Sequence, residues 1–158
     1  LHSMDIGQGE VLRNGEDVVI LAIGTTVTPA LGAAQILASN GIEATVVNSR
    51  FAKPLDVKLI TGLARHIKYV VTVEENTLCG GFGSNVVALL SRLKSKSGVE
   101  NQIKNLGLPD EFIGQGEQAI LHAKYALDAQ GIAREVRNLF PQQAFQSLVT
   151  FDQADLVD

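Results

Sequence analysis

The sequence lacks the patterns that would tie it to an oxidising compartment or a membrane. It has a single cysteine, Cys79, so no internal disulfide can form, which agrees with a reducing compartment. The longest apolar run, residues 18–23, is far shorter than the roughly 20 residues of a membrane span. No charged-then-apolar secretion signal opens the chain. We therefore predict a cytoplasmic protein without membrane contact.

Basic patches are also missing. The chain carries 13 Lys and Arg against 17 Asp and Glu, a net charge of −4, and no basic run is interleaved with aromatic residues. This balance disfavours a nucleic-acid partner. With 158 residues of which 46% are hydrophobic, the chain is long enough for one globular domain with its own core.

Common catalytic motifs are absent as well. No Gly-x-Ser-x-Gly elbow occurs, and the three histidines, His2, His66 and His122, have no second His or Cys at metal-binding spacing. His66 ends a predicted helix, where an imidazolium would favour the negative end of the helix dipole, so its predicted role is structural. The residues alone predict neither a catalytic group nor a metal site.

Apolar strands alternate with helical patterns along the chain. The predicted strands cover residues 18–23, 42–48, 69–73 and 103–108, and the predicted helices cover residues 28–40, 56–67, 86–93, 117–125 and 132–140. Such alternation is typical of right-handed β-α-β crossovers. It predicts a doubly wound α/β fold, with a mostly parallel, mixed sheet of about five strands and helices on both faces.

Cap residues predict where the helices begin and end. Thr28 is the predicted N-cap of the first helix and Gly41 its left-handed stop. Asp56 can cap the second helix, and Asp128 the last. Gly32 inside the first helix costs about 1 kcal/mol relative to alanine, which predicts that another element packs closely against it.

The chain divides into three predicted parts. Residues 1–4 resemble a cloning remnant or the start of an excised fragment, residues 5–140 form the domain, and residues 141–158 form a tail. The tail has no clear period but carries apolar residues such as Phe145 and Phe151, so docking and disorder both remain open.

Residues 70–84 form the most site-like stretch, because a β-branched strand, a glycine-rich turn and a helix start follow one another. A phosphate loop would need a lysine before Ser84, and the dinucleotide motif a small residue where Val86 stands. Glu74 and Glu75 would repel a phosphate held there. The stretch is therefore predicted to be structural, with a positive φ at Gly81 or Gly83.

The charged residues that follow the predicted strands each have two open interpretations. Glu74 and Glu75 could form an acid/base pair, but neighbours on a strand point to opposite sides, which favours one of them facing a backbone or a helix N-terminus. Arg50 could bind an anion, or it could pair with Glu74, Glu75 or Asp56 from neighbouring strand ends. The pairing is the favoured interpretation.

A series of motifs then suggests a family. In order they cover residues 7–13, 18–25, 44–51, 53–56, 71–76 and 80–84. Together they resemble the C-terminal domain of the transketolase-like thiamine diphosphate enzymes. Residues 106–113 with Gly116, followed by residues 127–132, narrow the resemblance to the 1-deoxy-D-xylulose-5-phosphate synthase family. Gly114 and Gln115 depart from the acidic residue and histidine expected there.

The resemblance implies a parent enzyme that decarboxylates pyruvate on thiamine diphosphate, with Mg²⁺, and joins the two-carbon unit to D-glyceraldehyde 3-phosphate. In such enzymes the cofactor supplies the carbon chemistry. This sequence contains no Gly-Asp-Gly motif for the metal and diphosphate, so no catalytic or cofactor-binding residue carries over. The resemblance implies a third domain that binds no cofactor, is inactive alone, and has the remaining parent domains as partners.

In the family this domain contributes to a homodimer, and an interface is therefore expected. The carboxyl ends of the strands are the predicted surface, around Arg50, Phe51, Glu74, Glu75 and Phe82. The other candidate residues at this end belong to the adjoining turn: Gly81, Gly83 and Ser84.

Two alternatives remain at this point. The C-terminal domain of a 2-oxoacid dehydrogenase β-subunit shares the Lys-Pro-Leu-Asp and Gly-Gly-Phe-Gly patterns, although residues 106–110 argue against it. A free-standing ligand-binding or assembly module of the same fold is the second alternative.

Overall fold

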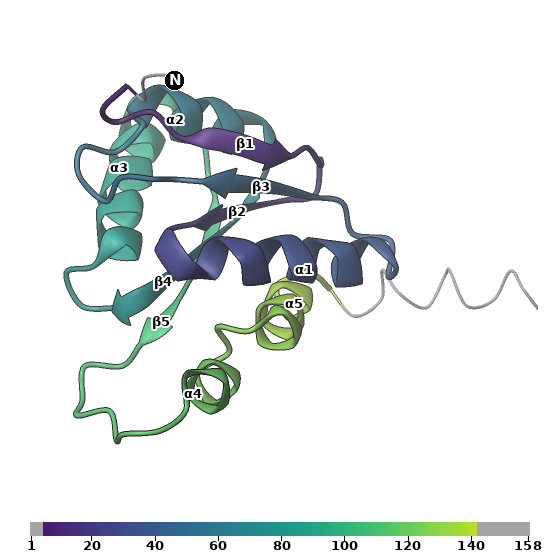
Figure 1. Cartoon of the computed structure of the whole chain (residues 1–158). Helices are drawn as coiled ribbons and strands as arrows, with labels where there is room; N and C mark the ends of the chain where they lie inside the picture. The colour runs from purple at the N-terminus through teal and green to yellow at the C-terminus, as the bar shows by residue number, and fades with distance from the viewer. Residues whose placement is uncertain (1–4, 142–158) are drawn as a thin grey trace, which may run out of the picture.

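Five strands form one mixed sheet in the computed structural model, which describes residues 5–141 (Figure 1). Their order is β1-β3-β2-β4-β5, with β1 antiparallel to β3 and the other neighbours parallel. The strands are β1 (Glu10–Arg13), β2 (Val18–Ala22), β3 (Ala44–Asn48), β4 (Tyr69–Thr77) and β5 (Gln102–Leu108). This sheet confirms the predicted fold class.

Helices cover both faces of the sheet. They are α1 (Val27–Ala38), α2 (Val57–His66), α3 (Phe82–Ser97), α4 (Gln118–Lys124) and α5 (Ala129–Arg137), and a short 3₁₀ turn, η1 (Gly24–Thr26), precedes α1. α1 and α5 pack on one face, and α2 and α3 on the other. The doubly wound arrangement follows from β-α-β crossovers on alternating sides.

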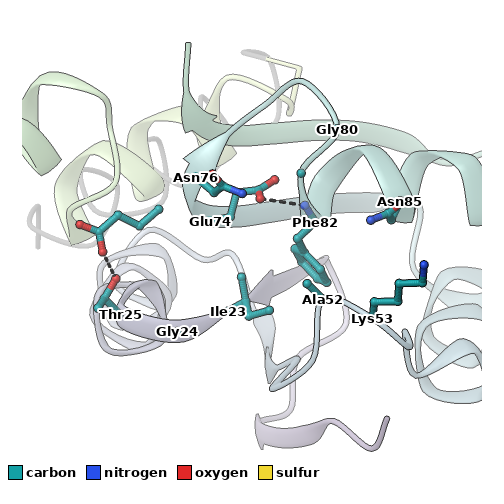
Figure 2. A pocket seen from close by; sticks show the side chains of 12 residues that line it. Ile23, Gly24, Thr25, Ala52, Lys53, Glu74, Asn76, Gly80, Phe82 and Asn85 are labelled. Carbon is teal, nitrogen blue, oxygen red and sulfur yellow. Dashed lines mark hydrogen bonds between the residues drawn. The ribbon is translucent and has the colours of Figure 1, made fainter. Parts of the chain in front are cut away.

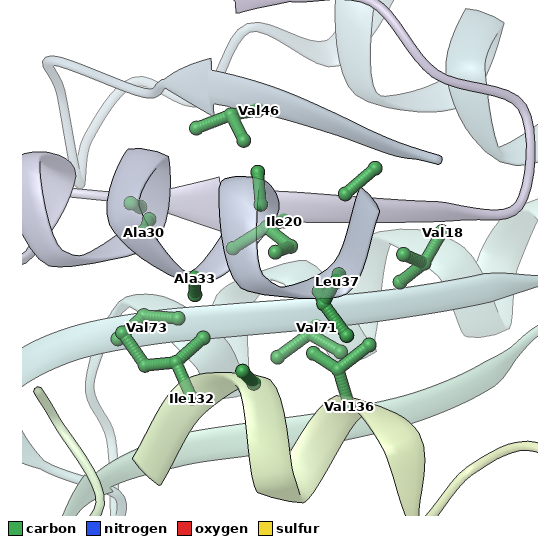
Figure 3. Close-up of a cluster of buried hydrophobic side chains, with 14 of the residues drawn as sticks. Val18, Ile20, Ala30, Ala33, Leu37, Val46, Val71, Val73, Ile132 and Val136 are labelled. Carbon is green, nitrogen blue, oxygen red and sulfur yellow. The ribbon is translucent and has the colours of Figure 1, made fainter. Parts of the chain in front are cut away.

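Two apolar layers hold the domain together. Figure 3 shows the layer between the sheet and α1 with α5, where Ile20 and Val71 meet Leu37 and Ile132. All five residues of β2 are buried, which explains why that segment reads as a continuous apolar run rather than an alternating one. Full burial of each Val, Ile or Leu side chain contributes about 1.5–3 kcal/mol.

The close packing expected at Gly32 is present. A Cβ atom added to Gly32 would lie 3.0 Å from the Cβ of Ala129, at the contact between α1 and α5. The left-handed conformation predicted at Gly41 is confirmed by its φ of 75°, although α1 ends at Ala38, with Ser39 as its C-cap, rather than at residue 40. The predicted N-cap at Asp56 is confirmed, because its side chain accepts a hydrogen bond from the Leu59 amide at 2.9 Å. Asp128 caps α5 through the Gly131 amide at 2.8 Å.

Several predicted boundaries were wrong. Thr28 is not the N-cap of α1, because the helix begins at Val27 and Thr26 takes the cap position, with its hydroxyl donating to the Val73 carbonyl at 2.9 Å. The last helix begins at Ala129 rather than at residue 132. β4 continues to Thr77 instead of ending before the glutamates, since β5 pairs alongside it.

Strand β1 is the element that residue patterns alone left unassigned. Its four residues are largely exposed, and its register with β3 shifts between Val11 and Arg13. A short, irregular edge strand has little apolar alternation to detect. Within residues 5–141, no helix is long and apolar enough to cross a membrane. Residues 1–4 and nearly all of the predicted tail, residues 142–158, lie outside the described part of the chain.

Candidate functional site: the carboxyl edge of the sheet

The carboxyl ends of β2, β3 and β4 surround a pocket of about 420 Å³ (Figure 2). Its walls come from the residues after β2, from the segment after β3, and from the end of β4 with the start of α3. Among the residues that line it are Thr25, Lys53, Glu74, Glu75, Phe82 and Asn85. This edge is where open α/β sheets commonly place a ligand site.

Glu74 fills the N-terminus of α3 from within the protein. Its side chain is buried, with 2% exposure, and its two oxygens accept hydrogen bonds from the backbone amides of Phe82 and Gly83 at 2.7 and 2.8 Å. Figure 2 shows the bond to Phe82. A carboxylate satisfies amide groups that a helix start leaves without partners and complements the helix dipole. The prediction that one glutamate faces a helix N-terminus is confirmed.

The glycines of this turn are required by close contacts. A Cβ atom on Gly81 would collide with the Glu74 carboxylate. A Cβ atom on Gly83 would lie 2.6 Å from the Thr72 hydroxyl oxygen and 2.9 Å from Asn105. The predicted positive φ was misplaced, because it occurs at Gly80, with φ 74°. Gly81 has an extended backbone at the cap position.

Ser84 closes the turn with its side chain. Its hydroxyl donates to the Leu78 carbonyl at 2.7 Å and accepts from the Gly80 amide at 3.2 Å. Cys79 is exposed in the same turn. These bonds give Ser84 a structural role at the start of α3.

Glu75 points away from Glu74 and binds three side chains. It accepts hydrogen bonds from the Thr25 hydroxyl, from Gln118 Nε2 at 3.0 Å, and it lies 2.9 Å from His122 Nε2. The bonds from Thr25 first, then from His122 and Gln118, lower the pKa of Glu75 to about 2. This carboxylate therefore stays ionised and ties α4 to the sheet edge. We call these four residues the Glu75 cluster.

Residue patterns gave no sign of the partners of Glu75. Gln118 and His122 lie more than 40 positions further along the chain, on a helix without any buried residue. The signal that could have located them is their i, i+4 spacing, which places both side chains on one face of a helix.

Arg50 does not pair with Glu74, Glu75 or Asp56, so that prediction was wrong. Its guanidinium binds the Glu10 carboxylate instead. The antiparallel strand β1 places Glu10 opposite Asn48, two positions from Arg50, and this strand was not anticipated. The carboxylate of Asp56 is occupied by the amides of Gly9, at 3.0 Å, and Leu59.

The predicted interface needs a correction. Phe82 and Glu74 are each 2% exposed, so neither offers surface to a partner, since both are already used in the core and in the helix cap. Arg50 and Phe51 are half-buried and Glu75 is exposed. An interface through these three residues stays a prediction.

The chemistry available at this edge is limited. The two adjacent carboxylates diverge to different partners, so they do not form an acid/base pair. Among residues 5–141 no group of three or more His, Cys, Asp or Glu side chains is placed to hold a metal ion. The geometry supports a rigid structural junction.

The chain belongs to the transketolase C-terminal domain family, whose model matches residues 7–132. Its curated relatives carry a more particular name. A 1-deoxy-D-xylulose-5-phosphate synthase of Dehalococcoides mccartyi (strain CBDB1) is 48% identical over 141 residues, which cover 88% of this chain and 21% of the relative. Synthase 1 of Geobacter sulfurreducens is 51% identical over 133 residues, covering 84% of this chain and 20% of that protein.

Solved structures agree on the fold. A split-gene transketolase described as an inactive beta4 tetramer superposes with a TM-score of 0.73 at 36% identity. The match covers 85% of this chain and 42% of that one. A Pichia stipitis transketolase variant gives 0.60 at 19% identity, over 84% of this chain and 18% of that one, and supports the fold alone. This chain spans about a fifth of the length of the curated relatives.

Proposed function

We propose that this chain is the C-terminal domain of a 1-deoxy-D-xylulose-5-phosphate synthase, a thiamine-diphosphate-dependent transferase that condenses pyruvate with D-glyceraldehyde 3-phosphate. The observation that carries the proposal is the identity of about 50% to named synthases across nearly the whole domain. The same relatives, together with residues 106–110, favour the synthase over a 2-oxoacid dehydrogenase β-subunit.

Within that enzyme the proposed role of the domain is assembly. The described residues do not fit a Mg²⁺-diphosphate group, because the N-terminus of α3 already holds the Glu74 carboxylate and Glu75 adds a second negative charge nearby. Repulsion between like charges would oppose the diphosphate. We therefore assign thiamine diphosphate and Mg²⁺ to other parts of the parent enzyme, and we expect this chain to be inactive alone.

The proposed partners are the remaining domains of the parent enzyme and a second copy of this chain, in the cytoplasm. The split-gene transketolase that resembles this chain is described as an inactive beta4 tetramer, which supports self-association of chains that contain a related domain. The net charge of −4 gives no support for binding nucleic acid.

A chimera tests the enzyme assignment. The last fifth of the Dehalococcoides mccartyi synthase is replaced by this chain, and deoxyxylulose phosphate formation is compared with the intact synthase and with a truncation that ends before the domain. We expect the chimera to restore most of the activity that the truncation loses. A folded chimera no more active than the truncation would contradict the proposal.

Calorimetry tests the inactive role. The isolated chain is titrated with thiamine diphosphate and Mg²⁺, with the intact synthase as the positive control. We expect no heat of binding from the chain at micromolar cofactor. Micromolar binding would show that the domain carries part of the cofactor site.

A further inference from the structure

The loop between β5 and α4 presents an aromatic side chain to solvent. Phe112 is fully exposed, at 106% of its reference area, and its neighbours Asp110 and Glu111 are exposed acidic residues. We call these three residues the acidic knob. An aromatic side chain buries about 150–250 Å² when it docks. Burial of Phe112 against a partner would therefore contribute a large favourable free energy.

A groove of about 600 Å³ lies between residues 52–57 and α3. Its floor and walls are mostly apolar and include Pro54, Val57 and Leu89, with Val57 52% exposed. Among residues 5–141, the charged ones that line it are two cations, Lys53 and Arg92. We call this the basic groove.

The knob and the groove are complementary in charge, and each combines charged with apolar groups. They are not joined within one molecule, because Phe112 is fully exposed. We propose that the acidic knob of one copy of this chain inserts into the basic groove of a second copy. Phe112 fills the apolar groove, while Asp110 and Glu111 face Lys53 and Arg92. This inference rests on the proposed assembly role and names the surfaces that carry it.

The topology allows the exchange to be reciprocal. The knob follows the carboxyl end of β5, and the groove is built from the segment after β3 and from α3, which follows β4. Parallel strands end at one edge of the sheet, so both surfaces belong to the same end of the domain. A two-fold axis facing that end lets each copy insert its knob into the other.

Charge reversal gives a sharp test. One variant reverses the knob with Asp110→Lys and Glu111→Lys, and another reverses the groove with Lys53→Glu and Arg92→Glu. Each variant alone places like charges against each other, whereas a mixture pairs every knob with an opposite groove. Sedimentation velocity up to several hundred micromolar should show dimers of the unmodified chain, monomers of each variant, and heterodimers in an equimolar mixture.

Phe112→Ala tests the apolar part of the contact. We expect dimerisation to weaken at least tenfold, while Leu12→Ala, an exposed apolar control on β1 at the opposite edge of the sheet, leaves it unchanged. Circular dichroism checks that each variant is folded. An unmodified chain that is strictly monomeric, a Phe112→Ala variant that dimerises normally, or a mixture without heterodimers would each overturn the inference.

The experiments distinguish a failure of the synthase assignment from a failure of the knob-and-groove contact. An active chimera together with a monomeric isolated chain would overturn the knob-and-groove contact and leave the synthase assignment intact. An inactive chimera together with charge-dependent dimers would contradict the synthase assignment and leave the contact standing.

Discussion

Two successive strand-to-helix connections of this domain differ sharply, although both start from parallel strands that end at the same edge. β4 reaches α3 through a four-residue turn, and α3 runs for 16 residues with five of them buried. β5 reaches α4 through residues 109–117, and α4 has seven residues and none buried. The first connection is part of the core, and the second lies on its surface.

The difference comes from what holds each helix start. α3 is capped by Glu74, a buried carboxylate of the strand beneath it. α4 is fastened by the next residue along that strand, because Glu75 binds Gln118 and His122. Two adjacent residues on opposite sides of β4 thus hold two helices. Glu74 caps α3 inside the core, and Glu75 holds α4 through exposed polar contacts. The following changes test this contrast.

The largest effect is expected from Glu74→Ala. It leaves two buried amides without an acceptor, which should lower the free energy of unfolding by about 3 kcal/mol, given 1–3 kcal/mol for each unsatisfied group. Glu74→Gln is the matched control, and it should cost roughly half as much because its single oxygen still accepts one bond. Urea unfolding measures both. Equal, small losses in the two variants would show that the cap does not stabilise α3.

Gly83→Val should cost roughly 1–3 kcal/mol through overpacking against Thr72 and Asn105. The cause is the close contact and not backbone strain, since Gly83 lies within α3. Gly114→Ala is the control in the other connection, because a Cβ atom there meets nothing within 4 Å. Thermal unfolding should show a clear loss for the first variant and little change for the second.

Glu75→Gln should lower stability in a pH-dependent way. The pKa of Glu75 falls from 4.5 to about 2 in the folded chain. The unfolded chain therefore takes up the proton first as pH decreases, so the stabilisation is present above pH 4.5 and is lost between pH 4.5 and 2. Urea midpoints of both proteins should differ at pH 7 and converge towards pH 2. A difference that is constant with pH would contradict the assignment.

The smallest global effect is expected from the double variant Gln118→Ala and His122→Ala. It releases α4 from the sheet edge without opening the core, since α4 has no buried residue. Hydrogen exchange in residues 109–124 should accelerate while the global unfolding midpoint stays nearly constant. Lys124→Ala on the same helix is the control. A large drop in the midpoint would show that α4 is integral to the core.

Local patterns were sufficient for the parts of the fold that depend on local chemistry. The buried run of β2, the cap at Asp56 and the left-handed Gly41 each follow from a few adjacent residues. The opposite directions of Glu74 and Glu75 follow from strand alternation alone. The capping role of Glu74 was one of two interpretations, and the structure selects it.

Contacts between distant segments were not predictable in the same way. Arg50 binds Glu10, which lies 40 positions away on a strand without a clear hydrophobic pattern. His122 binds Glu75, which lies 47 positions away. Phe82 was expected at an interface, because an apolar ring beside charged groups suits an interface better than water, but the structure buries it. Such pairings depend on sheet order, which a single sequence does not reveal.

The position of α5 bears on how the domain forms during synthesis. β2 is the second strand of this domain in chain order, but the face of the sheet behind α1 is completed only by Ile132 and Val136 of α5. About 115 residues must therefore emerge after β2 before this layer is sealed. Until then a nascent chain exposes apolar surface that chaperones recognise, so we expect the domain to become stable only late in its own synthesis.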